Sequence, residues 1–117
     1  MPSLPDPAHV VRQARDSIEE LNRLLLDEGM NLSAPVLADA VQALKSLVER
    51  LPQALDLSAR VLEILAARDA IAMDNGKTPQ TEATAAATEL RKVSTDAEQL
   101  ARGLSGPASK MSHMGVR

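Results

Sequence analysis

The sequence predicts an all-α fold, and the arrangement that we expect is an antiparallel four-helix bundle. The 117 residues contain no Phe, Trp, Tyr or Cys, so aliphatic side chains must fill the core. Alanine and leucine, which are prominent among them, lead the scale of helix propensity. Prolines stand where helices can begin, glycines stand where helices can end, and apolar residues recur between them at alternating spacings of three and four.

Two helices are predicted in the first half of the chain. Asp6-Pro7 has the form of an N-cap followed by a first helical residue, and Gly29 can end a helix, so the first helix is predicted over residues 7–28. Its apolar stripe consists of Val11, Ala14, Ile18, Leu21 and Leu25. Ser33-Ala34-Pro35 starts the second helix, over residues 34–51. The stripe of this helix consists of Leu37, Val41, Leu44, Val48 and Leu51.

Pro52 decides how the second helix continues. It removes an intrahelical hydrogen bond and disfavours the helical conformation at Leu51, so the chain either turns or kinks there. We expect a turn, which gives an up-down-up-down bundle. The alternative is a three-helix arrangement in which residues 34–74 form one long central helix of roughly 60 Å, kinked at Pro52. Such a rod would expose much apolar surface and would need a partner or a dimer.

The third helix is predicted over residues 56–74. Asp56 or Ser58 can cap its start, and Asn75-Gly76 can end it. Its apolar residues cover more than one narrow stripe of the helix surface. So wide an apolar surface predicts that this is the most buried helix of the bundle.

A fourth helix, over residues 79–103, provides the candidate interaction face. It begins at Thr78-Pro79, ends at Gly103 and holds a heptad rhythm of apolar residues, many of them alanines that let a neighbouring helix approach closely. The face consists of Ala83, Ala86, Leu90, Val93, Ala97 and Leu100. The same stripe could instead face the core of its own bundle.

The length of the chain suits one domain, which we expect over residues 1–104. Residues 105–117 are expected to form a flexible tail. In the alternative, Pro107 opens and Gly115 closes one short helix whose methionines dock onto the bundle.

Composition excludes several functional classes. The formal net charge of −3 gives no overall positive field, so binding to nucleic acid is not expected. No segment approaches the ~18 uninterrupted apolar residues of a membrane span, and Met1–Asp6 lacks a basic stretch followed by an apolar run. The absence of cysteine excludes disulfides, thiol catalysis and thiolate metal sites. We therefore expect a soluble cytoplasmic protein.

The sequence offers no candidate for catalysis or for binding a metal or cofactor. Its only histidines are His9 and His113, and neither has the Glu-x-x-His or one-turn spacing of a helical metal site. In the acidic cluster Asp16, Glu19 and Glu20, the first two residues have arginines four residues away, as ion pairs on a solvated helix face do. Glycine-rich phosphate loops and nucleophile elbows are absent from the sequence. The chain is not expected to be an enzyme.

The function that remains is a non-catalytic helical protein–protein interaction module, which binds a protein partner or itself. The oligomeric state stays open. One alternative is an accessory or regulatory protein of a bacterial mobile element acting near DNA, although helices of ~20 residues are not typical of helix-turn-helix motifs. Another is small-molecule binding in the bundle core, since an aliphatic pocket leaves no motif. Leu51-Pro52-Gln53 and Asn75-Gly76…Pro79 resemble segments of small helical proteins from high-GC bacteria, which implies no activity.

Overall fold

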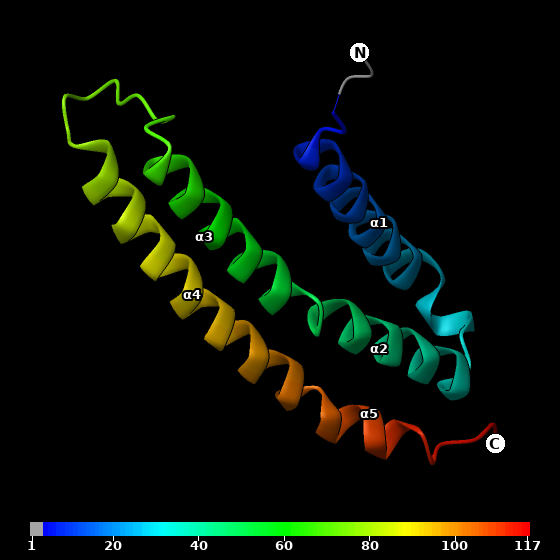
Figure 1. The fold of residues 1–117 in the computed structure, drawn as a ribbon. Coiled ribbons are helices and arrows are strands. Elements are labelled where there is room, and N and C mark those ends of the chain that lie inside the picture. The colour runs from blue at the N-terminus through cyan, green and yellow to red at the C-terminus, as the bar shows by residue number, and fades with distance from the viewer. Residues whose placement is uncertain (1–3) are drawn as a thin grey trace. The chain divides into compact units, whose positions relative to one another are not determined.

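The computed structural model describes residues 4–117, and every regular element in this range is a helix. The elements are α1 (Pro7–Glu28), the 3-10 turn η1 (Gly29–Asn31), α2 (Ala34–Val48), α3 (Leu51–Ala67), α4 (Pro79–Gly103) and α5 (Ser105–Met111) (Figure 1). Residues 1–3 of the segment Met1–Asp6 lie outside the described range. No helix within that range is long and apolar enough to cross a membrane.

The chain divides into two compact units, Met1–Ser33 and Ala34–Arg117. The prediction of one domain over residues 1–104 therefore stays a prediction. In the first unit, α1 begins and ends where the sequence predicts. Asp6 accepts a hydrogen bond from the backbone N–H of Ala8 at 3.0 Å, and proline occupies the first turn. Gly29 is the C-cap of α1, as predicted, but its backbone is right-handed and not left-handed, and it opens η1.

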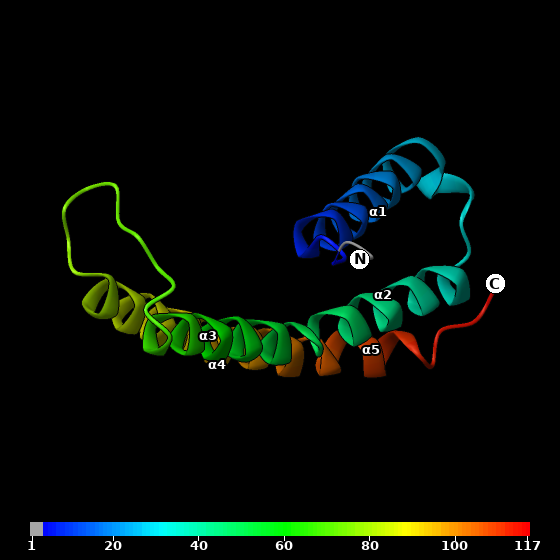
Figure 2. The same cartoon turned by 45° about the horizontal axis from the view of Figure 1, so that its top comes forward.

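The second unit is a helical hairpin. Helices α2 and α3 follow one another in nearly the same direction, and α4 and α5 return antiparallel beside them (Figures 1 and 2). Helix α4 packs along α3, and α5 packs along α2. The four-helix bundle is not confirmed. The kinked alternative fits better, because α2–α3 and α4–α5 each form one interrupted helix, and α1 is the third.

The predicted turn at Pro52 is wrong for a local and a tertiary reason. Proline is tolerated in the first turn of a helix, and Pro52 stands there in α3. Before it, the N–H of Arg50 donates to the carbonyl of Leu47 at 3.1 Å, a tightened turn that keeps Arg50 in the right-handed region. The chain therefore continues forward, and α4 contacts both α2 and α3. The predicted helices 34–51 and 56–74 become α2, ending at Val48, and α3, beginning at Leu51.

Helix α3 also ends earlier than predicted, at Ala67. The N–H of Asp69 donates to the carbonyl of Ala66 at 3.1 Å, and the N–H of Ala70 donates to that of Leu65 at 2.9 Å. These two bonds form a Schellman motif in which Asp69, with a φ of 57°, takes the left-handed position that glycine usually occupies. The expected terminator Gly76 lies in the following loop, where its φ is 75°.

The last segment is ordered into a helix, so the expected flexible tail is wrong in residues 105–111. Helix α4 ends at Gly103, but the chain continues without a reversal into α5. Helix α5 begins at Ser105 rather than at Pro107, and it ends at Met111 rather than near Gly115. Met111 and Met114 line a small hollow with the first turns of α2, as the short-helix alternative predicted.

Asp69 gives a prediction about the end of α3. Replacing it with valine should lower the free energy of unfolding by about 1–2 kcal/mol, because a β-branched residue is strained in the left-handed region. Asp69→Asn is the matched control, since asparagine tolerates that region, and it should change stability by less than about 0.5 kcal/mol. Urea unfolding followed by far-UV circular dichroism measures both. Equal stabilities of the two variants would contradict the motif.

Candidate interaction surface

The interior of the hairpin consists of small side chains. Among the described residues, those that are buried are Ala59, Ala83, Ala87, Ser94, Ala97, Ala101 and Ala108. Four of them, Ala87, Ser94, Ala101 and Ala108, repeat every seven residues along α4 and α5 and are called the seam below. A heptad repeat keeps one line of residues facing a partner helix, and alanine and serine in that line let two backbones approach closely.

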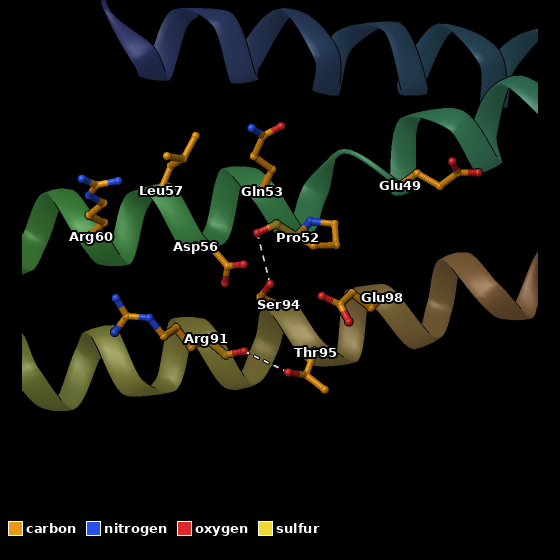
Figure 3. A pocket seen from close by; sticks show the side chains of 10 residues that line it. All are labelled: Glu49, Pro52, Gln53, Asp56, Leu57, Arg60, Arg91, Ser94, Thr95 and Glu98. Carbon is orange, nitrogen blue, oxygen red and sulfur yellow. Dashed lines mark hydrogen bonds between the residues drawn. The ribbon is translucent and has the colours of Figure 1, made fainter.

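One hydrogen bond fixes the register of the two helices. The hydroxyl of Ser94 donates to the carbonyl of Pro52 at 3.1 Å, from α4 to α3 (Figure 3). Because the helices are antiparallel, Ala59 and Ala87, each seven residues away, lie opposite one another in the same register. Both are 0% exposed, as close packing at this level requires. The hydrogen bond also satisfies the buried hydroxyl of Ser94, so the seam tolerates a polar residue.

The predicted face on α4 is divided by this seam. Ala83 and Ala97 are buried in the hairpin, and Ala86 and Leu90 are half-buried. Val93 and Leu100 are 49% and 57% exposed. The buried line runs through Ala87, Ser94 and Ala101 instead of Ala86, Val93 and Leu100, one residue away. Both lines have the heptad period, and the apolar character of the second favoured it. Side-chain size distinguishes the two lines, because the buried line consists of alanine and serine.

The seam gives a prediction about packing. Ala87→Leu should lower the free energy of unfolding by about 1–3 kcal/mol, because the added atoms force the two helices apart. Ala85→Leu, two residues away on an exposed position of α4, is the matched control and should change stability by less than about 0.5 kcal/mol. Thermal unfolding measures both. A leucine tolerated at position 87 as well as at position 85 would show that the helices are not in close contact.

On one flank of the seam lie charged side chains. Glu63 of α3 and Arg91 of α4, each four residues after a fully buried alanine, form an ion pair in which one of two hydrogen bonds measures 3.0 Å. The hydrogen bond from Arg91 lowers the pKa of Glu63, with the positive charge of Arg91 acting in the same direction and burial opposing it. Lys45 and Glu49 pair farther along, at 2.7 Å, and the hydrogen bond lowers the pKa of Glu49.

An open groove of about 790 Å³ runs along this charged flank. Its lining includes the carboxylates of Glu49, Asp56 and Glu98 and the guanidinium groups of Arg60 and Arg91 (Figure 3). Opposite charges are thus mixed within the groove, which gives it no dominant sign for a charged ligand. Among the described residues, no cluster of three or more His, Asp or Glu side chains could hold a metal ion.

The other flank of the seam is apolar. On α4 it holds Val93 and Leu100, which come directly before the seam residues Ser94 and Ala101. On α3 it holds Leu51, which comes directly before Pro52, and residues at neighbouring helical turns. Six exposed side chains define what we call the apolar face: Leu47, Leu51, Val61, Leu65, Val93 and Leu100, which are between 38% and 57% exposed. The first of them ends α2, the next three lie on α3 and the last two on α4.

The apolar face corrects the prediction that the third helix is the most buried. Helix α4 contains five buried residues, whereas α3 contains Ala59 alone. The wide apolar surface of α3 is real, but α4 covers only the strip next to the seam. Leu57 and Ile64, on the outward side of α3, are exposed as well. Apolar surface of this kind, rimmed by polar residues, is typical of an interaction site.

The Glu63–Arg91 pair gives a prediction about pH. A lowered pKa means that ionised Glu63 stabilises the folded state above the ordinary pKa of 4.5 and loses this effect as the pH falls below it. Glu63→Gln should therefore melt at a slightly lower temperature than the original protein at pH 7 and at the same temperature near pH 2. Because both side chains are exposed, high salt should reduce the difference at pH 7. A difference that grows on acidification would contradict the pair.

The hairpin thus presents two unlike flanks, a groove lined by charges of both signs and an apolar face that no other element of the hairpin covers. Comparison with protein-family models, with curated proteins and with solved structures finds no match for this chain. The function is therefore inferred from the exposure, charge and register of these side chains.

Proposed function

We propose that this chain is a non-catalytic helical protein–protein interaction module, which binds an apolar helical surface of its partner through the apolar face. The observation that carries the proposal is that the small side chains of the hairpin are buried while larger apolar ones are exposed. The interior holds alanine and serine, whereas leucine and valine stand exposed on one flank. Amphipathic helices bind in this way when apolar anchors three and four residues apart meet a complementary groove.

The energetics of the hairpin support a partner. Burying an alanine side chain removes little apolar area from water, whereas full burial of a valine or leucine contributes about 1.5–3 kcal/mol. The exposed leucines and valines of the apolar face therefore hold hydrophobic stabilisation that the alanines of the seam cannot supply. Closing this face against a second protein would bring that stabilisation into the complex, where it contributes to affinity after the cost of association.

The charged flank supports the same choice of surface. Arg91 is engaged by Glu63, Lys45 by Glu49, and Arg102 by Glu98, so these basic groups are offset by carboxylates within the hairpin. A phosphate backbone is bound through basic groups that accumulate on one face. The apolar face is therefore the favoured surface for a macromolecular partner, because removing its side chains from water lowers the free energy of the complex.

Site-specific photo-crosslinking tests the proposal. A benzophenone amino acid at position 61, in the middle of the apolar face, should give a covalent adduct with a protein in the native cells. The same group at position 53, on an exposed residue beside the charged groove, is the matched control and should give much less. An adduct of either kind at position 61, with another protein or with a second copy, supports an interaction module. Equal or absent labelling at the two positions would overturn it.

A further inference from the structure

We infer that the partner is a second copy of this chain, and that two hairpins pack through their apolar faces into an intermolecular four-helix bundle. This inference rests on the proposed function and names its partner. A two-fold axis parallel to the helices would place α3 of each copy on α4 of the other. Every helix in such a bundle then has antiparallel neighbours, as α3 and α4 already are within one hairpin.

The sizes of the side chains on the apolar face fit this arrangement. The α3 side carries Leu51, Val61 and Leu65, and the α4 side carries Ala86, Val93 and, at its end, Leu100, so the α4 side is flatter only around Ala86. The two-fold axis lays the α3 side of one copy on the α4 side of the other, twice, with Val61 near the level of Ala86. Large side chains facing small ones allow the layers to interdigitate, which is how closely packed interiors are built. A surface of this kind is complementary to itself.

The charges beside the apolar face are also complementary. The outer edge of α4 next to Val93 and Leu100 carries three carboxylates at heptad spacing, Glu82, Glu89 and Asp96. The outer side of α3 carries no carboxylate at the corresponding positions, and it has an arginine at each end, Arg50 and Arg68. Stacking α3 on α4 of the second copy sets the arginine-bearing edge against the acidic edge. Stacking α3 on α3 would instead set arginines against arginines and leave both acidic edges together.

The register observed within the hairpin predicts one specific pair. A two-fold axis along the helices leaves the height of every residue unchanged, so the level shared by Pro52 and Ser94 holds between copies as well. Arg50 lies two residues before Pro52, and Asp96 lies two residues after Ser94, on the antiparallel helix. Arg50 therefore lies at the level of Asp96 of the second copy. Within the described residues, Asp96 has no ion pair.

The extent of the apolar face matches a dimer contact. Its six side chains expose on the order of 500 Å², close to the largest patch of a typical monomer. The charged edges beside it extend it toward the ~800 Å² per partner of a standard interface. A contact of this size is large enough for a stable homodimer.

Light scattering with refractive-index detection tests the inference on the full chain, which has no Trp or Tyr to absorb strongly. The expected mass is twice 12.5 kDa. Val61→Glu should weaken the dimer at least about tenfold, because it buries a charge in the contact. Gln53→Glu adds the same charge beside the groove and should leave the dissociation constant within about twofold. Far-UV circular dichroism shows whether each variant remains helical.

Charge reversal provides a second readout on exposed residues, which keeps the inference testable if Val61→Glu unfolds. Arg50→Glu and Asp96→Arg should each weaken the dimer by about two- to fivefold, and the double variant should regain the original affinity. Arg60→Glu, a reversal beside the groove, should have no effect on the dissociation constant. Failure of the double variant to regain affinity would overturn the placement of α3 on α4.

The two proposals fail in different ways. A full-length chain that stays monomeric at high concentration would overturn the inference that the partner is a second copy. If crosslinking from position 61 then still captures another protein, the proposed interaction module stands with a different partner. If position 61 gives no adduct and the chain is monomeric, the face is covered within its own chain and both proposals fail. A dimer disrupted by Gln53→Glu and not by Val61→Glu would assign the contact to the charged flank.

Discussion

The close approach of α3 and α4 along small side chains is the constraint on which the hairpin depends. Ala59 and Ala87 can be fully buried opposite one another only if neither side chain holds the backbones apart. The hydroxyl of Ser94 occupies the same line and donates across it to the carbonyl of Pro52. Alanine has little apolar area to bury, so this interior determines geometry more than it supplies hydrophobic stabilisation.

The seam also explains why Pro52 does not reverse the chain. A proline in the first turn of α3 is compatible with a helix that bends and continues, provided that another element holds both halves in line. Helix α4 contacts α2 as well as α3, and α5 extends the contact along α2. The interruption between α2 and α3 thus becomes a local tightening at Arg50 inside a long antiparallel pair.

Placing the small residues in the seam separates the remaining surface into two kinds. One flank receives Glu63 and Arg91, which pair across the helices, and the groove beside them carries charges of both signs. The other flank receives the larger aliphatic side chains, such as Leu51 and Leu100, for which the narrow seam has no room. The small side chains that let the helices approach closely therefore leave the larger apolar side chains exposed. The proposed function and the proposed dimer rest on this exposed surface.

The sequence by itself determined the helix ends that depend only on a few neighbouring residues. Asp6-Pro7 and Thr78-Pro79 each place an extended residue before a proline in a first helical turn, and α1 and α4 begin there as predicted. The end of α3 was missed because Asp69 takes a left-handed conformation that glycine signals far more clearly. Only the tertiary structure decided whether Pro52 bends or turns and which α4 line is buried. Periodicity cannot show whether Val93 or Ser94 is buried, because both lines repeat every seven residues. Ser94 is the buried one because its side chain is small enough to lie against the facing helix.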